Sequence, residues 1–324
     1  MTHTPEWTDA VIQSSQDVTP TVRELTLSPA NVAQAFDPGS HLQVQVLVNG
    51  KPQTRSYSLV GPPDGLTYRI AVKCLPEGRG GSLAMWRLNV GDRLRITPPQ
   101  NHFPLDLSAP AYLLVAGGIG ITPLVLMAQT LVQRGAQVKL LYGARREEEL
   151  AFAPSLTTSL GDRFKTFVTA KGETIDFAAA IASLPVGGQL YICGPALMLD
   201  AARSAWTLAG RPPANLRFET FGTSGRLAPE AFEVLIPRQK VQLRVAADES
   251  LLDALEMAGV QSLSNCRRGE CGLCAMDVLA IDGEIDHRDV FLSDHEKLEN
   301  KRLCICVSRV IGSVTLDSSY RPDV

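Results

Sequence analysis

The sequence predicts a multidomain fold: an antiparallel β-barrel or sandwich, then an α/β domain with a parallel sheet, then a small, cysteine-rich α+β domain. Three observations support this prediction. The 324 residues exceed one average domain, the hydrophobic rhythm changes after Pro104, and five of the seven cysteines lie beyond residue 265. We expect domain boundaries at 1–104, 105–226 and 227–324, with a linker near 222–231 where Gly, Ser, Thr and Pro gather.

Composition indicates a globular protein with no preference for nucleic acid. Hydrophobic residues make up 45% of the chain and charged residues 20%, and the formal net charge is −3. Residues 1–226 carry 20 Lys and Arg against 17 Asp and Glu, whereas residues 227–324 carry 11 against 17. This acidic final third indicates either a surface for a charged partner or a well-solvated face.

The first ten residues contain no apolar segment of the signal-peptide type, so we expect a cytoplasmic, reducing location. In that compartment cysteines serve as thiols or metal ligands rather than disulfides. Residues 107–133 lack charge, as a membrane helix would. Gly117, Gly118, Gly120 and Pro123 interrupt this stretch, which favours a buried strand, a turn and a buried helix, and we expect no membrane association.

Residues 11–96 alternate between apolar and polar side chains in short runs, which is typical of antiparallel strands. Runs at 42–48 and 67–72 show the pattern, and turn signals occur at Asn49-Gly50 and at 62–65. After Pro104 apolar strands precede helical stretches, which predicts a parallel sheet with crossover helices. The expected strands are 112–116, 138–143 and 190–193, and the expected helices are 122–134 and 195–208. Beyond Phe232 we expect strands at 241–245 and 313–316 and a helix at 251–258.

Cys266, Cys271 and Cys274 have the C-x4-C-x2-C spacing of plant-type [2Fe–2S] ligation, with further cysteines at 304 and 306. Gly269 and Gly272 would allow the loop to turn tightly and to aim backbone N–H groups at the sulfurs. Four thiolates could also hold zinc, but zinc sites usually show two short C-x2-C pairs. If 303–307 is a strand, Cys304 and Cys306 share a face, and parity leaves the fourth ligand open.

Two glycine-containing turns indicate a dinucleotide site. The segment Gly117-Gly118-Ile119-Gly120-Ile121-Thr122-Pro123 follows an apolar strand and opens a helix, with Thr122 able to cap it and Pro123 suited to its first turn. Cys193-Gly194-Pro195 ends a second strand before a second helix. Both turns would lie at the carboxyl edge of one sheet, where ligands bind. Each motif alone is also compatible with an ordinary tight turn.

A third motif has the residue types that bind a flavin. Arg55-Ser56-Tyr57-Ser58 combines a phosphate-binding guanidinium, an aromatic ring and two hydroxyls, and Gly80-Gly81-Ser82 follows further along. By itself the first motif could be an ordinary strand.

The order of these motifs resembles the phthalate dioxygenase reductase family across essentially the whole chain. Matching segments are 55–58, 117–123, 193–195, 218–222, the cysteine loop, 101–105, 286–289 and 306–309. The resemblance implies FMN, a nicotinamide that is usually NADH, and a β-grasp [2Fe–2S] domain that reduces an oxygenase. The activity would be that of an NAD(P)H-dependent oxidoreductase, the reductase component of a Rieske-type ring-hydroxylating or demethylating system. Its oxygenase partner would dock near the cysteine loop.

The resemblance also implies roles for individual residues. Ser58 and Cys193 would take part in hydride transfer, Ser58 near flavin N5 and Cys193 near the nicotinamide, and Phe221 would lie beside the flavin. Cys306 would be the fourth cluster ligand. The residues expected to bind flavin or dinucleotide are Arg55, Ser56, Tyr57, Ser58, Ala71, Val72, Lys73, Gly80, Gly81, Ser82, Gly117, Gly118, Gly120, Thr122, Arg145, Cys193, Gly194, Pro195 and Phe221.

The nicotinamide preference stays open between NADH and NADPH. A residue after the second strand of a dinucleotide fold contacts the adenine ribose, where an acid favours NADH and an arginine accommodates NADPH. Here Arg145-Arg146 precedes Glu147-Glu148-Glu149. NADH comes first by resemblance. Alternative functions are reduction of a quinone or metal chelate, and redox sensing without turnover.

Overall fold

The computed structural model describes residues 6–76, 78–221 and 227–317. Contacts between Cα atoms divide these residues into two compact units. One comprises the described residues up to 76 and residues 81–219, and the other comprises residues 78–80, 220–221 and 227–317. Part of the expected linker, 222–226, lies outside the described residues. The domain boundaries at 104 and 226 stay predictions.

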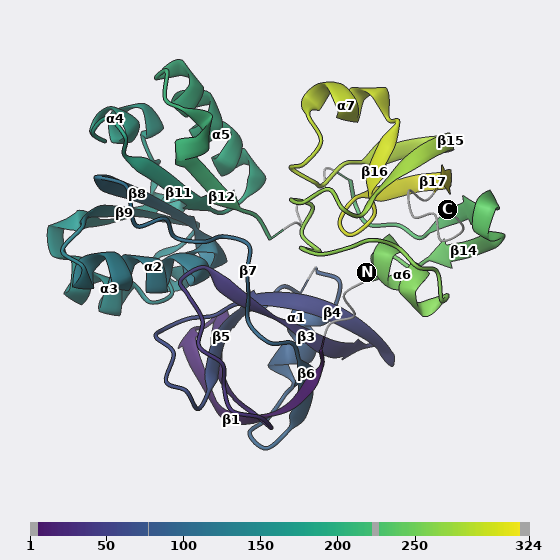
Figure 1. The fold of residues 1–324 in the computed structure, drawn as a ribbon, viewed down its shortest axis with the longest axis horizontal. Helices are drawn as coiled ribbons and strands as arrows, with labels where there is room; N and C mark the ends of the chain where they lie inside the picture. Colours follow the sequence, from purple (N-terminus) through teal and green to yellow (C-terminus); the bar gives the residue numbers. More distant parts are fainter. Residues whose placement is uncertain (1–5, 77, 222–226, 318–324) are drawn as a thin grey trace. The chain divides into compact units, whose positions relative to one another are not determined.

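The first part of the larger unit is an antiparallel barrel, drawn in purple and blue in Figure 1. Its strands pair in the order β4-β3-β6-β1-β2-β5, and β7 pairs with β3. A bridge between Leu59 and Ile70 joins the two ends of this order. The elements are β1 Thr8–Thr19, β2 Val22–Pro29, β3 Ser40–Val48, β4 Lys51–Ser58, β5 Tyr68–Lys73, α1 Gly81–Trp86, β6 Arg93–Ile96 and β7 Gln100–Asn101.

Inward-facing apolar side chains hold the barrel together. Leu42, Val44 and Val46 alternate along β3 and are buried, and Asn49-Gly50 turns the chain into β4 with positive φ at both residues. The strand pattern in 42–48 and the turn after it are therefore confirmed.

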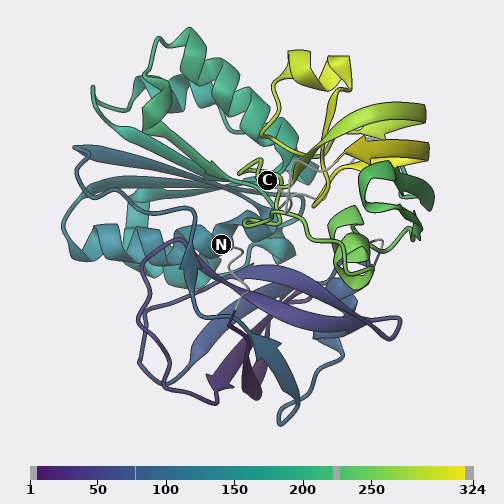
Figure 2. The ribbon, with the colours of Figure 1, turned by 45° about the vertical axis from the view of Figure 1, so that its right-hand side comes forward.

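The second part of the larger unit is a parallel sheet of strand order β10-β9-β8-β11-β12. Figures 1 and 2 show α2 and α3 on one face of this sheet and α4 and α5 on the other. The strands are β8 Ala111–Gly117, β9 Gln137–Ala144, β10 Phe164–Val168, β11 Gln189–Cys193 and β12 Leu216–Glu219. The helices are α2 Thr122–Gln133, α3 Ala153–Leu160, α4 Phe177–Ala182 and α5 Ala196–Leu208.

The smaller unit is an α+β fold around a mixed sheet of strand order β14-β13-β17-β15-β16. Its elements are β13 Phe232–Ile236, β14 Val241–Val245, α6 Leu251–Met257, β15 Ala275–Asp286, α7 Asp294–Glu299, β16 Arg302–Cys304 and β17 Arg309–Asp317. Strands β13 and β17 run parallel, whereas the other pairs are antiparallel. The three predicted fold types are confirmed.

Two local expectations are wrong. Strand β16 ends at Cys304 and Cys306 lies in the following turn, so the parity argument for 303–307 does not apply. A 3-10 turn, Gly118–Ile121, precedes α2, so the residue before the helix is Ile121, and the Thr122 hydroxyl instead donates to the Ile119 carbonyl at 3.0 Å. Within the described residues, no helix has the length and apolarity needed to cross a membrane.

Candidate functional site

The predicted flavin residues of the barrel come together at the ends of β4 and β5. Leu59 and Ile70 form an antiparallel bridge. Ser58, which precedes Leu59, therefore lies beside Ala71, which follows Ile70. The Ser58 hydroxyl is buried and finds no hydrogen-bond partner among the described residues, as is also true of the Ser56 hydroxyl. A buried hydroxyl in this state favours a ligand atom as its partner, because leaving it unpaired costs stability.

Arg55 packs closely against Gly81 at the start of α1. A Cβ atom added to Gly81 would lie 2.4 Å from Nε of Arg55, so the guanidinium lies directly over the start of α1. The Arg55 guanidinium donates to the Thr54 carbonyl at 2.9 Å and to the Gln53 side chain. Gly80 has φ of +75°, which lets the chain turn into this helix. A guanidinium offers paired N–H donors that suit a phosphate.

Other residues of the flavin set have structural partners. The Ser82 hydroxyl accepts a hydrogen bond from the Leu75 N–H at 3.1 Å, and the Val72 carbonyl accepts from the Trp86 indole at 3.0 Å. Lys73 reaches Glu149 of the α/β domain, with Nζ 3.2 Å from Oε2. Burial raises the pKa of Tyr57 to about 12, against the opposing charge of Arg55, so its phenol stays neutral.

The two predicted dinucleotide turns contact each other. Strands β8 and β11 pair in parallel with Ala116 opposite Cys193, so both turns emerge at the carboxyl edge. A Cβ atom on Gly120 would lie 2.2 Å from the Cys193 carbonyl oxygen, and one on Gly117 would lie 2.5 Å from Cδ of Pro195. The glycines are therefore required by backbone packing. Helix α2 continues from the 3-10 turn without a side-chain cap: the Thr122 N–H donates to the Ile119 carbonyl, and Pro123 carries no N–H.

Sequence reasoning missed Met198, the sulfur of which lies 3.0 Å from the Cβ position of both Gly117 and Gly194. In the sequence, an apolar residue inside a helix gives no sign that it packs against the two glycine turns rather than elsewhere in the core. Of the remaining candidates, Gly118 has φ of +53° in the turn, and Arg145 is exposed just beyond β9. Phe221 is half-buried and falls in the smaller unit, where its neighbour Thr220 donates to Glu270 of the cysteine loop.

The cysteines of the smaller unit form two contacting groups. Cys266 is hydrogen-bonded to Cys271, and Sγ of Cys274 lies 3.2 Å from Sγ of Cys306 and also interacts with Cys304. Among the described residues, no three His, Cys, Asp or Glu side chains converge as one metal ion would require. Two thiolates for each of two irons fit this arrangement better than a single zinc ion does.

The loop geometry also suits sulfur ligands. Gly269 and Gly272 have φ of +76° and +70°, as the tight turn requires. The backbone N–H groups of Arg268 and Glu270 both point at Sγ of Cys266 at 3.4 Å. A hydrogen bond from the Cys271 thiol, followed by these backbone groups, lowers the pKa of Cys266. Cys304 remains an alternative fourth ligand because its thiol also contacts Cys274.

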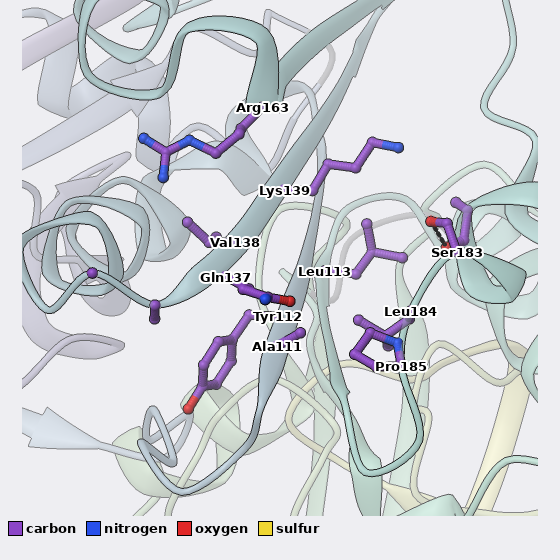
Figure 3. Close-up of a pocket in the computed structure, with 13 residues that line it drawn as sticks. Ala111, Tyr112, Leu113, Gln137, Val138, Lys139, Arg163, Ser183, Leu184 and Pro185 are labelled. Atoms are coloured by element: carbon purple, nitrogen blue, oxygen red, sulfur yellow. Dashed lines mark hydrogen bonds between the residues drawn. The ribbon is translucent and has the colours of Figure 1, made fainter.

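A separate pocket of about 380 Å³ lies at the opposite, amino edge of the parallel sheet (Figure 3). Its lining includes Tyr112, Val138, Lys139, Arg163 and Leu184. None of the predicted site residues lies in it. Ligands of doubly wound sheets bind at the carboxyl edge, so this pocket is not the dinucleotide site.

Comparison with known proteins supports a flavin domain and a [2Fe–2S] domain. Residues 9–104 match the oxidoreductase FAD-binding domain family, and residues 234–310 match the 2Fe-2S iron-sulfur cluster binding domain family. Residues 93–216 match the N-terminal domain of dimethylamine monooxygenase subunit DmmA-like proteins. These matches, with the geometry above, define the class: an iron–sulfur flavoprotein reductase.

Full-length relatives define the family. The chain is 39% identical over 312 residues to the heme-dependent oxidative N-demethylase beta subunit of Ectopseudomonas mendocina, covering 95% of this chain and 97% of the relative. It is 39% identical over 286 residues to the phenoxybenzoate dioxygenase subunit beta of Ectopseudomonas oleovorans, covering 87% and 86%. The solved structure of phthalate dioxygenase reductase matches with a TM-score of 0.82 and 31% identity, covering 96% and 98%. The chain belongs to the phthalate dioxygenase reductase family and is an NAD(P)H-dependent oxidoreductase of oxygenase systems.

Proposed function

We propose that this chain passes electrons from NADH through FMN to a [2Fe–2S] cluster and on to a Rieske-type oxygenase that hydroxylates an aromatic ring or removes a methyl group. The observation that carries the proposal is the arrangement of Cys266, Cys271, Cys274 and Cys306 in two contacting pairs. The relative from E. mendocina is a subunit of a heme-dependent N-demethylase, so a heme-containing demethylase is the second candidate acceptor. The reduced thiols fit a cytoplasmic location.

FMN is the proposed flavin because it is the flavin that the resemblance to the phthalate dioxygenase reductase family implies. A bound flavin can accept two electrons as a hydride and release them one at a time, which is the conversion that a one-electron cluster needs. The chain's contribution is to orient it. Arg55 would hold the phosphate, and the buried Ser58 hydroxyl would donate to the reacting edge of the ring. Extraction of the flavin followed by chromatography distinguishes FMN from FAD.

The dinucleotide would bind with its pyrophosphate at the start of α2, across the contacting turns at Gly120 and Cys193. Cys193 is buried at the end of β11 and would face the nicotinamide ring. The close packing of the two turns fixes the spacing between these two contacts.

The oxygenase partner would dock around Cys271. This cysteine is half-buried, whereas Cys266, Cys274 and Cys306 are buried, so the accessible edge of a bound cluster would lie at Cys271. Leu273 is 48% exposed beside it. The Phe291 ring is 43% exposed and covers Gly272, where an added Cβ would lie 2.2 Å from the ring. Exposed apolar side chains around a redox centre suit a transient protein contact.

The proposal is tested with Cys271→Ser. We expect NADH-dependent reduction of cytochrome c to fall at least about tenfold, while reduction of the flavin by NADH, followed by its absorbance, continues at the wild-type rate. Cys74, which is half-buried in the barrel, supplies the control Cys74→Ser. Unchanged cytochrome c reduction in Cys271→Ser would show that electrons leave from the flavin, as in a quinone or metal-chelate reductase. A wild-type protein that NADH reduces but that passes electrons to no acceptor would support redox sensing.

A further inference from the structure

We infer that the turn after β9, Arg145-Arg146, binds the 2′-phosphate of NADPH, so that the enzyme accepts NADPH as well as NADH. We call these two residues the basic turn. The inference rests on the proposed function, because it concerns the nucleotide that feeds the flavin.

The basic turn lies where a doubly wound fold distinguishes the two nucleotides. Gly117 of β8 pairs with Gly143 of β9, so the basic turn leaves the sheet at the same edge as the pyrophosphate-binding turn. Arg145 follows Gly120 by 25 positions. In dinucleotide folds the ribose-contacting residue comes about 20 residues after the glycine turn. An acid there bonds the ribose 2′-hydroxyl, and an arginine accommodates a 2′-phosphate.

The three nearby acids are engaged with cations in the structure. Glu147 pairs with Lys171 at 2.5 Å, and Glu149 pairs with Lys73 at 3.2 Å. Glu148 lies 3.9 Å from Arg146, and both side chains are more than half exposed. The hydrogen bond from Lys171 lowers the pKa of the Glu147 carboxyl, which keeps that pair charged. A ribose 2′-hydroxyl would therefore compete with existing ion pairs for these carboxylates.

Compared with these three acids, the two arginines are more available to bind a ligand. Arg145 is exposed, and within the described residues the structure records no ion pair for its side chain. Among the described residues, the one recorded ion-pair partner of the Arg146 side chain is Glu148, at a distance that gives a weak, solvent-screened pair. A guanidinium offers two parallel N–H donors that match phosphate oxygens, and two guanidinium groups match a dianion. An acid in this position would instead repel the 2′-phosphate.

The pocket at the amino edge is a second basic place on the same domain, and it provides the control. Lys139 and Arg163 line it, as Figure 3 shows, and Nε of Arg163 donates to the Leu160 carbonyl at 3.1 Å. A nucleotide bound there by its phosphate would lie at the opposite edge of the sheet from the two glycine turns, where it could not reduce the flavin. Arg163→Gln removes one exposed positive charge from the same domain, as Arg145→Gln and Arg146→Gln do.

The experiment measures anaerobic flavin reduction in the purified holoenzyme by stopped-flow absorbance, with NADH or NADPH as the reductant. We expect wild-type protein to be reduced by both, and Arg145→Gln and Arg146→Gln each to lower the apparent NADPH affinity at least about tenfold, with a smaller change for NADH. Arg163→Gln should keep the wild-type ratio of the two affinities. A parallel measurement uses 2′-AMP and 5′-AMP as competitors of NADH. We expect wild-type protein to bind 2′-AMP more tightly and the two basic-turn variants to lose that preference.

The inference is overturned if NADH reduces the flavin but NADPH does not, or if 2′-AMP binds no better than 5′-AMP. It is also overturned if Arg163→Gln reproduces the loss seen in the basic-turn variants. Failure of both nucleotides to reduce the flavin would instead overturn the proposed function.

Discussion

Substitution of Ser58 should affect flavin binding and folding stability in opposite directions. Its buried hydroxyl has no partner among the described residues, so Ser58→Ala removes a polar group that burial penalises. We expect flavin-free Ser58→Ala to unfold at the wild-type temperature or higher, with a gain of up to about 1 kcal/mol. Flavin binding should weaken by about tenfold, because the hydroxyl no longer donates to the ring. Thermal unfolding and flavin titration measure the two effects.

Thr97→Val is the matched control for Ser58→Ala. Thr97 is also buried in the barrel, but its hydroxyl accepts the Gln43 N–H at 3.0 Å. Its loss should lower the free energy of unfolding by about 1 kcal/mol and leave flavin affinity unchanged. A destabilised Ser58→Ala with normal flavin affinity would show that the Ser58 hydroxyl serves the fold.

The role of a single residue could be predicted from the sequence where the residues next to it in the chain decide that role. The spacing of Cys266, Cys271 and Cys274 identified the cysteine loop, because that spacing is typical of plant-type [2Fe–2S] ligation, and Gly269 has the positive φ that its turn needs. Strand parity could not choose between Cys304 and Cys306, since the end of β16 is set by its pairing with β15, and the choice of Cys306 by resemblance stays a prediction. The bond from the Leu75 N–H to the Ser82 hydroxyl could not be predicted either, and the role of Ser82 at the flavin stays a prediction.

At the scale of elements, the meeting of two strand ends builds the dinucleotide site, and Gly120 is its contact point. An added Cβ would lie 2.2 Å from the Cys193 carbonyl oxygen, and backbone atoms there cannot move aside independently. We expect Gly120→Ala to lower the free energy of unfolding by about 1–3 kcal/mol. The apparent affinity for NADH should fall at least about tenfold. Denaturant unfolding and NADH titration of the flavin absorbance measure these changes.

Gly143→Ala serves as the control on the neighbouring strand. Its added Cβ would lie 3.3 Å from the flexible Met198 methyl group, which can shift. Its effects on stability and on NADH affinity should be smaller than those of Gly120→Ala. Equal effects of the two substitutions would indicate that any alanine near the carboxyl edge of the sheet is disruptive, and that contact between the turns is not the cause.

Elements with strong periodicity were predictable, and those set by packing were not. Strand β14 and helix α6 follow their patterns closely, since alternation or a capped apolar stretch encodes each one. Strand β10 was missed because it is an edge strand in which only Val168 is buried. The 3-10 turn before α2 was also missed, and it moved Thr122 out of the capping position.

At the scale of the whole molecule, the charge is divided between the units. Residues 227–324 carry 17 acidic against 11 basic side chains, and this acidic excess belongs to the unit that holds the cysteine loop. Sequence composition predicted this asymmetry. It could not predict that the barrel and the parallel sheet pack into one compact unit, because contacts such as Lys73 with Glu149 join residues 76 positions apart.

This charge division predicts how the rate of electron transfer to an acceptor depends on salt. Cytochrome c is basic and ferricyanide is an anion, so raising NaCl from about 10 to about 200 mM should slow cytochrome c reduction and should not slow ferricyanide reduction.

Leu273→Ser should lower kcat/KM for cytochrome c by about threefold to tenfold, because it removes apolar contact beside Cys271. Leu279→Ser, at a 58% exposed position on β15, should leave that constant unchanged. Iron content and the visible spectrum verify that each variant keeps its cluster. If both serine variants behave alike, or if salt affects both acceptors equally, docking around Cys271 is the wrong account of electron exit.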